Sequence, residues 1–195
     1  MAQSFLLDAP LPAMDSLDAR SDLELIAAIN NGDAASFEVL YFRHRDWVVS
    51  LAHRFTNDSD AALDVMQETF LYFLKKFPGF RLTANLKTFL YPAIRNLSIA
   101  ARRKARRYQA TEAELKQIES TASEGAAVAL NELQIVLQTL SQEHRETILL
   151  RFVDGLSLAE IAAAMEIPLG TVKSRLHTAL ETLRNDKRTR EFFNK

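Results

Sequence analysis

The residues best suited to chemistry lie near the C-terminus, on one face of a segment with helical spacing. Over 169–183 apolar residues recur every three or four positions and form one stripe of a helix. The opposite face carries hydroxyl, imidazole and cationic groups and no acidic residue before Glu181. Such groups can contact base edges and phosphates in a DNA groove. The face and its flanks consist of Gly170, Thr171, Lys173, Ser174, Arg175, His177 and Thr178.

A short helix and a tight turn precede this face. Ser157 followed by Glu160 is the pattern of a capping box, which predicts a helix start. Pro168 suits the first position of the next helix, because its missing N–H would be unpaired there. A polar outer face alone is typical of any solvated helix. The order of helix, turn and second helix, with a basic tail over 184–190, predicts a DNA-binding helix-turn-helix.

A second candidate for nucleic-acid contact is a basic run in the middle of the chain. Six Lys and Arg residues and no acid occur over 95–107, although the net charge of the whole chain is −1. The stretch 111–132 is acidic in contrast, with five Glu against one Lys. Helical spacing puts several of the basic residues on one side, where they could bind successive phosphates. This side holds Tyr91, Arg95, Arg102 and Arg106, with Asn96, Arg103 and Arg107 beside them.

The composition argues against an enzyme, a metal site or a cofactor. The chain has no cysteine, and its four histidines (His44, His53, His144 and His177) lack metal-ligand spacing. No glycine loop that could cradle phosphates and no nucleophile motif is present. No run of 18 apolar residues occurs and no basic residue precedes Arg20, so we expect neither membrane insertion nor a signal peptide. We expect the protein to act in the cytoplasm.

The apolar pattern predicts an all-α fold of two small helical domains joined by a flexible linker. Helical periodicity recurs along the chain, and no segment of convincing strand period appears. Pro92 lies inside a predicted helix, which it should bend or cause to restart near Tyr91. The polar stretch after the basic run has the composition of a linker. The predicted divisions are a flexible tail 1–21, a domain 22–108, a linker 109–128, a domain 129–185 and a basic tail 186–195.

The predicted third helix is amphipathic in a way that suggests a docking surface. Asp60, Asp64, Gln67 and Glu68 fall on one side of it. Without further information, such a polar side more often faces only water. The apolar side is predicted to comprise Leu63, Met66, Phe70, Phe73 and Phe77.

Several motifs resemble the sigma factors of bacterial RNA polymerase. The stretch 140–152 (LSQEHRETILLRF), the stretch 158–162 (LAEIA) and the stretch 170–176 (GTVKSRL) resemble region 4 of that family. The stretches 64–70 (DVMQETF) and 86–97 (LKTFLYPAIRNL) resemble region 2. The chain lacks room for a region 3 domain, so it is most similar to the extracytoplasmic-function (ECF) group. The resemblance covers about 22–107 and 129–185.

The resemblance implies an alternative sigma factor without catalytic activity. Its partners would be core RNA polymerase and promoter DNA, with an anti-sigma factor or other regulator as a further partner. The helix-turn-helix face would recognise the minus-thirty-five element, and the domain carrying it would bind the flap of the second polymerase subunit. The polar side of the third helix would dock on the clamp helices of the largest subunit. The minus-ten element would be melted by Phe80, Arg81, Lys87, Tyr91, Arg95, Asn96, Arg102, Arg103, Arg106 and Arg107.

Two other functions remain open at this stage. A dimeric helix-turn-helix activator would share the C-terminal motif, but it should not contain an arginine-rich helix after an aromatic loop. A helical protein-binding adaptor would show a weak salt dependence of DNA binding. We also hypothesise that the acidic linker would run through the polymerase interior near the RNA path.

Overall fold

The computed structural model describes residues 18–115 and 136–186, and it gives residues 108–115 by their backbone course only. All regular secondary structure in these ranges is α-helical, which confirms the predicted fold class. Most of the predicted linker and most of each predicted tail lie outside the described residues. None of the described helices is long and apolar enough to cross a membrane.

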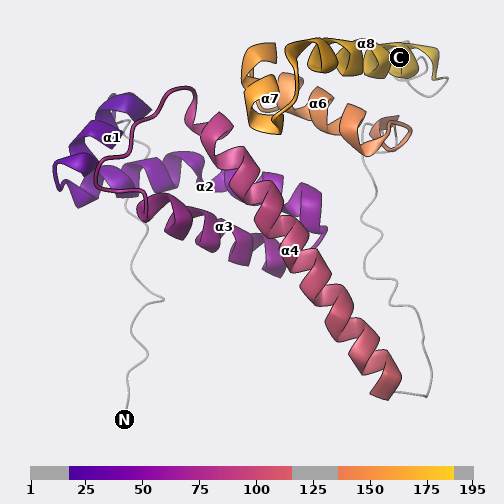
Figure 1. Cartoon of the computed structure of the whole chain (residues 1–195), viewed down its shortest axis with the longest axis horizontal. Coiled ribbons are helices and arrows are strands. Elements are labelled where there is room, and N and C mark those ends of the chain that lie inside the picture. The colour runs from indigo at the N-terminus through magenta and orange to yellow at the C-terminus, as the bar shows by residue number, and fades with distance from the viewer. Residues whose placement is uncertain (1–17, 116–135, 187–195) are drawn as a thin grey trace.

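The first lobe is a four-helix unit whose helix starts are set by side-chain caps. Ser21 and Glu24 form a capping box, and the carboxylates of Asp33 and Asp58 cap the next two helices. Leu40, Val48, Phe73 and Leu90 are almost completely buried between the helices. The helices are α1 (Asp22–Asn30), α2 (Ala34–Thr56), α3 (Ser59–Leu74) and α4 (Leu86–Leu115), as Figure 1 shows.

The helix α4 differs from the sequence prediction in two ways. It begins at Leu86 and continues through Pro92, so it does not restart near Tyr91. It also continues to Leu115, so residues 109–115 of the predicted linker are helical in this structure. The residues over 109–115 include Glu, Ala and Leu, which have high helix propensity and lengthen the helix beyond the basic run. Figure 1 shows the C-terminal half of α4 extending past the other helices of its lobe.

The end of the predicted N-terminal tail is held against the first lobe. The guanidinium of Arg20 pairs with Asp18 at 2.6 Å and donates a hydrogen bond of 2.9 Å to the hydroxyl of Ser36. Arg43 donates to the backbone oxygen of Asp18 at 2.9 Å. The interaction with Arg20 lowers the pKa of Asp18 to about 2. The chain is therefore anchored from residue 18 onward.

The second lobe contains the predicted helix-turn-helix. Its helices are α6 (Gln142–Phe152), α7 (Leu158–Met165) and α8 (Leu169–Asn185). The capping box of Ser157 and Glu160 is present at the start of α7, as predicted. Glu166 ends α7 in the left-handed conformation with φ 55°, and Pro168 is the N-cap of α8 rather than its first residue. A small cluster of Leu137, Leu140, Ile148 and Ala179 packs α6 against α8.

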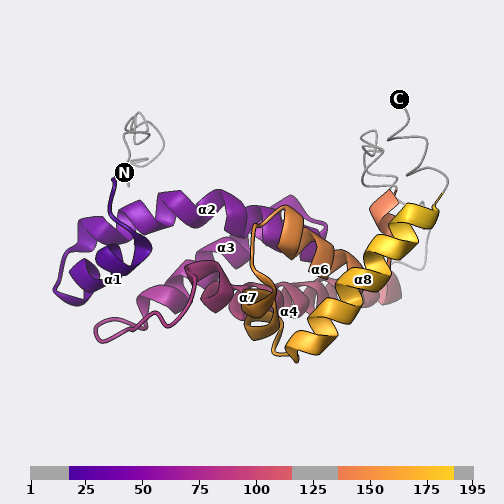
Figure 2. The ribbon, with the colours of Figure 1, turned by 90° about the horizontal axis from the view of Figure 1, so that it is seen from above.

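The two lobes pack against each other through α7 and α4. Both views of the ribbon place α7 beside the N-terminal half of α4 (Figures 1 and 2). The main apolar cluster is continuous across this contact, and it joins Leu86 and Leu90 to Leu156 and Ile161. In this arrangement the two lobes therefore share buried surface.

Candidate nucleic-acid interface

The outer face of α8 is open to solvent. Gly170, Lys173, Ser174, His177 and Thr178 are all exposed. The hydroxyl of Ser174 donates to the backbone oxygen of Thr171 at 3.0 Å, and His177 Nε2 lies 3.5 Å from a carboxylate oxygen of Glu181. Thr171 is half-buried. The exposed residues form a continuous polar surface along the first turns of the helix, as the sequence predicted.

Arg175 differs from the rest of this face because it is held within its own lobe. Its side chain is 18% exposed, and its guanidinium pairs with Glu143 of α6 at 2.5 Å. This ion pair restrains the guanidinium beside α6. A phosphate could still approach the partly exposed group, but Arg175 is less available than Lys173.

The C-terminal part of the basic run is exposed along α4. Arg102, Arg103, Lys104, Arg106 and Arg107 are all exposed. They lie on the half of the helix that extends beyond the bundle (Figure 1). A row of cations on one helix can bind successive phosphates of a DNA strand.

The N-terminal half of α4 is occupied by contacts within the molecule. Tyr91 is completely buried, and its ring packs edge-on against Phe55 with centroids 6.3 Å apart. It cannot contact DNA in this arrangement, which corrects its placement among the minus-ten residues. The ammonium of Lys87 donates to the backbone oxygen of Asp154 at 3.1 Å, and Arg95 lies 3.9 Å from Glu146. Asn96 remains exposed.

Asp154 is the centre of the contact between the lobes. Its carboxylate is only 2% exposed, and it accepts hydrogen bonds from Arg54 at 2.8 Å and from the indole N–H of Trp47 at 3.0 Å. Both donors belong to α2, about a hundred positions earlier in the chain. No sequence pattern marks Asp154 as an interlobe residue, because an Asp-Gly pair after a helix indicates only a turn.

Glu146 is a second buried carboxylate at this contact. Its side chain is 10% exposed, and one of its oxygens has no hydrogen-bond partner within the described structure. Burial raises the pKa of Glu146 to about 7, although Arg175 and Arg54 act in the opposite direction. The group is therefore partly protonated near neutral pH.

The loop between α3 and α4 carries the aromatic residue predicted to act on the minus-ten element. Phe80 is half-buried, and its ring packs against Phe73, Phe77 and Phe89 at centroid distances of 4.7–5.5 Å. Arg81, the next residue, is exposed. The loop therefore rests on an aromatic cluster and presents its following residues to solvent.

The polar side of α3 is exposed as predicted, but it is bordered by apolar residues. Asp60, Asp64, Gln67 and Glu68 are exposed. Leu63, predicted to be buried, is 45% exposed, and Leu71 is 55% exposed. Leu63 follows Asp60 by three positions and precedes Gln67 by four, so it lies beside the polar residues, and its assignment to the apolar side is wrong.

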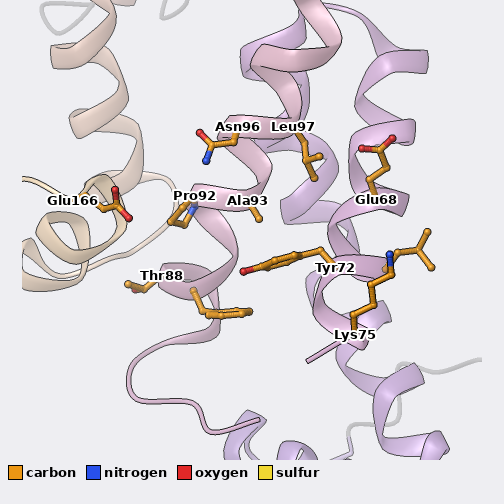
Figure 3. Close-up of a pocket in the computed structure, with 11 residues that line it drawn as sticks. Glu68, Tyr72, Lys75, Thr88, Pro92, Ala93, Asn96, Leu97 and Glu166 are labelled. Atoms are coloured by element: carbon orange, nitrogen blue, oxygen red, sulfur yellow. The ribbon is translucent and has the colours of Figure 1, made fainter. Parts of the chain in front are cut away.

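A groove of about 710 Å³ lies between α3 and α4 beside this polar side. Figure 3 shows the ring of Tyr72 reaching from α3 toward α4 and Glu166 of the second lobe approaching Pro92. Tyr72 stacks on Phe89 with centroids 6.0 Å apart, and the ammonium of Lys76 lies 4.4 Å from the centre of the tyrosine ring. The groove extends the exposed surface of α3 with aromatic and aliphatic side chains.

Comparison with known proteins places both lobes in one family. The family profile described as Sigma-70 region 2 matches residues 40–108, and the profile described as Sigma-70, region 4 matches residues 136–185. The ECF RNA polymerase sigma-E factor of Escherichia coli is 32% identical over 182 residues, which cover 85% of this chain and 93% of that protein. The ECF RNA polymerase sigma factor SigW of Bacillus subtilis is 29% identical over 177 residues, which cover 84% and 95%.

Solved structures show the same fold. The sigma factor RpoE of Bartonella quintana, in complex with the anti-sigma factor NepR, aligns with a TM-score of 0.56 at 26% identity over 77% of this chain and 98% of that one. CnrH, in complex with the cytosolic domain of CnrY, aligns with a TM-score of 0.60 at 21% identity over 83% and 93%.

Proposed function

Because the chain belongs to the ECF group of RNA polymerase sigma factors, which direct the polymerase to promoters to start transcription, we propose that its two lobes divide that task between them. The first lobe binds the polymerase and opens the DNA, and the second lobe recognises the upstream promoter element. Sigma factors are non-enzymatic initiation factors, and we assign no catalytic activity to this chain.

The proposed polymerase-binding surface is the exposed side of α3. Asp60, Asp64, Gln67 and Glu68 supply charge and hydrogen-bond acceptors, and the neighbouring Leu71 supplies apolar area. Interfaces of this kind combine an apolar centre with a polar rim. The clamp helices of the largest polymerase subunit are the proposed partner of this surface. The second lobe is proposed to bind the flap of the second subunit.

The proposed melting surface is the loop before α4 together with the basic residues of α4. Arg81 and Asn96 are exposed and can contact a separated strand. Phe80 fixes the start of the loop by packing against Phe89. The exposed arginines over 102–107 can bind the backbone of that strand. We leave Tyr91 out of this surface because its side chain is in the core.

The proposed surface for the minus-thirty-five element is the outer face of α8. Lys173, Ser174, His177 and Thr178 are exposed in the first turns of the second helix of the helix-turn-helix. This is the part of a recognition helix that enters the major groove. Gly170 and Thr171 at its N-terminus allow close approach to the phosphates, where the helix end favours negative charge.

The packing of the lobes implies that this structure is a closed form. Lys87 and Arg95 are engaged by the second lobe, and α7 covers the N-terminal half of α4. A DNA strand that follows α4 along its whole length therefore requires the lobes to separate. We propose that core polymerase favours the open form and that an anti-sigma factor or other regulator favours the closed form. This exchange would take place in the bacterial cytoplasm.

One observation carries the division of labour: the polar sides of α3 and α8 both stay exposed although the lobes pack together. The test is promoter-directed transcription with purified core polymerase and the double variant Ser174→Ala, His177→Ala. We expect specific transcripts to fall by about tenfold or more, since each lost base contact costs about 1–3 kcal/mol. Co-elution with core polymerase on gel filtration should not change.

The matched control is Thr182→Ala, which removes a hydroxyl from the same helix one turn beyond the proposed residues. It should transcribe like the unaltered protein. Loss of co-elution in the double variant, or failure of the unaltered protein to co-elute with core polymerase at low salt, would refute the proposal.

A further inference from the structure

The side chain of Asn30 links the end of α1 to the loop between α3 and α4. Its amide oxygen accepts hydrogen bonds from the backbone N–H groups of Gly79 at 2.6 Å and Phe80 at 3.1 Å. Its amide nitrogen donates to the backbone oxygen of Phe80 at 2.8 Å. One side chain thus pairs with three backbone groups of the loop, about 50 positions away in the sequence.

These bonds are not needed to end the helix on which Asn30 lies. The cap of α1 is Asn31, whose backbone N–H donates to Ala28 and Ile29. The hydrogen bonds of the Asn30 side chain within the described structure all go to the loop. An amide is suited to this role because it carries both an acceptor and donors. The Asn30 amide therefore pairs with the loop backbone as a neighbouring peptide group would.

The far end of the loop is fixed in a similar way. The side-chain oxygen of Asn85 accepts a hydrogen bond of 2.9 Å from the backbone N–H of Lys87, at the start of α4. Between the two anchors, Arg81, Thr83 and Ala84 are exposed and Leu82 is half-buried. Gly79 adopts φ 96°, a conformation that favours glycine and turns the chain into this segment. We call residues 81–84 the arch.

We propose that Asn30 is a positioning residue that holds the arch in the shape required to receive an unpaired base of the minus-ten element. This inference rests on the proposed function, which assigns the loop and α4 to promoter melting. Extruding a base from a duplex is unfavourable, so a receiving surface that is already ordered lowers the barrier to opening. Asn30 touches no DNA in this role, and it acts through the backbone of Gly79 and Phe80.

The test compares Asn30→Ala and Asn30→Asp with the neighbouring control Asn31→Ala. Alanine removes all three hydrogen bonds, whereas aspartate keeps the acceptor for the N–H groups of Gly79 and Phe80. Each variant is loaded on core polymerase, and opening of a promoter that contains 2-aminopurine at the minus-ten element is followed by fluorescence. The affinity for core polymerase and the rate on a template with a pre-opened bubble are measured beside it.

We expect Asn30→Ala to slow opening of duplex promoter by about tenfold, with Asn30→Asp about threefold slower and Asn31→Ala unchanged. The affinity for core polymerase should stay within about twofold, because the hydrogen bonds of the Asn30 side chain within the described structure go to the loop and not to the polar side of α3. On the pre-opened template the deficit of Asn30→Ala should shrink to about twofold or less. A residue that only stabilised the fold would instead reduce polymerase binding and leave the deficit on both templates.

Opening by Asn30→Ala at the rate of the unaltered protein would overturn the inference and leave the proposed function in place. Failure of the unaltered protein to open the promoter would instead overturn the proposed function. If circular dichroism shows that Asn30→Ala has lost helix, Asn30→Asp decides the matter. A wild-type opening rate in a folded Asn30→Asp protein then refutes a positioning role.

Discussion

The contact made by Asp154 gives the sharpest prediction about the closed form. Replacing Asp154 by alanine removes a buried carboxylate and leaves the guanidinium of Arg54 and the indole N–H of Trp47 without their acceptor. We expect the lobes to separate in this variant. Asparagine at the same position keeps one oxygen for these donors and should have an intermediate effect.

The size of the effect follows from the burial of the pair. The side chain of Asp154 is 2% exposed and that of Arg54 is 24% exposed, so the ion pair is poorly screened by water. Removing one partner of a buried charge pair costs about 3–5 kcal/mol. Because Arg54 regains some hydration when the lobes open, we take the lower value, which changes the ratio of closed to open molecules by about 100-fold.

The absence of cysteine makes the measurement direct. The variants Ser59→Cys and Gln142→Cys place one unique thiol on an exposed position of each lobe for spin or dye labelling. Distance distributions between the two labels then report the fraction of closed molecules. The control is Asp46→Asn, which removes the same charge from an 84% exposed side chain on α2.

We expect one short distance in the unaltered protein and in the control, and a broad, longer distribution in Asp154→Ala. Identical distributions in all three proteins would refute the reasoning that Asp154 holds the lobes together. A broad distribution in the unaltered protein would show that the closed form is not the resting state in solution.

Two further predictions concern the other charged groups. Glu146 has a pKa of about 7 in the closed form. We expect its pKa to return to the lower, ordinary value when the lobes open. The closed form therefore binds a proton more readily and becomes more favoured as the pH falls through about 7. The charged groups facing it are the guanidinium groups of Arg54, Arg95 and Arg175. The same labels should therefore show more closed molecules at pH 6 than at pH 8, and Glu146→Gln should abolish this difference. For α3, the double variant Asp64→Ala, Glu68→Ala should weaken binding to core polymerase by about tenfold or more without changing helix content, since each charged contact is worth about 1 kcal/mol or more. Equal affinity in a titration of labelled protein would contradict docking through α3.

The local features of this protein could be predicted from its sequence. Ser157 and Glu160 cap a helix through groups three positions apart, and the apolar stripe of α8 repeats every three or four residues. These are short-range interactions, so the residues that make them are neighbours in the sequence. The exposed faces of α3 and α8, and the order of the two family regions, follow from the same patterns.

The length of α4, which its hydrophobic pattern did not predict, also has a local cause. The stretch after the basic run has few apolar residues, a composition typical of a linker, yet its glutamates and alanines extend α4 to Leu115. Leu63 was expected on the apolar side of α3, but its spacing from Asp60 and Gln67 puts it beside the polar residues, and its side chain is 45% exposed. Hydrophobic pattern and helix propensity are separate properties, so a stretch with few apolar residues can still be helical.

Long-range pairs were decided only by the tertiary structure. The helical wheel puts Tyr91 on the side of the arginines, but the packing of the lobe buries its ring against Phe55. Asp154 meets Trp47 and Arg54 across about a hundred positions, and Asn30 meets the loop across about fifty. Periodicity describes one helix at a time, and a hydrogen bond between distant segments leaves no regular spacing in the sequence. Local sequence therefore determined the helices and the chemistry of their exposed faces. Only the tertiary structure determined which helices and side chains bury one another.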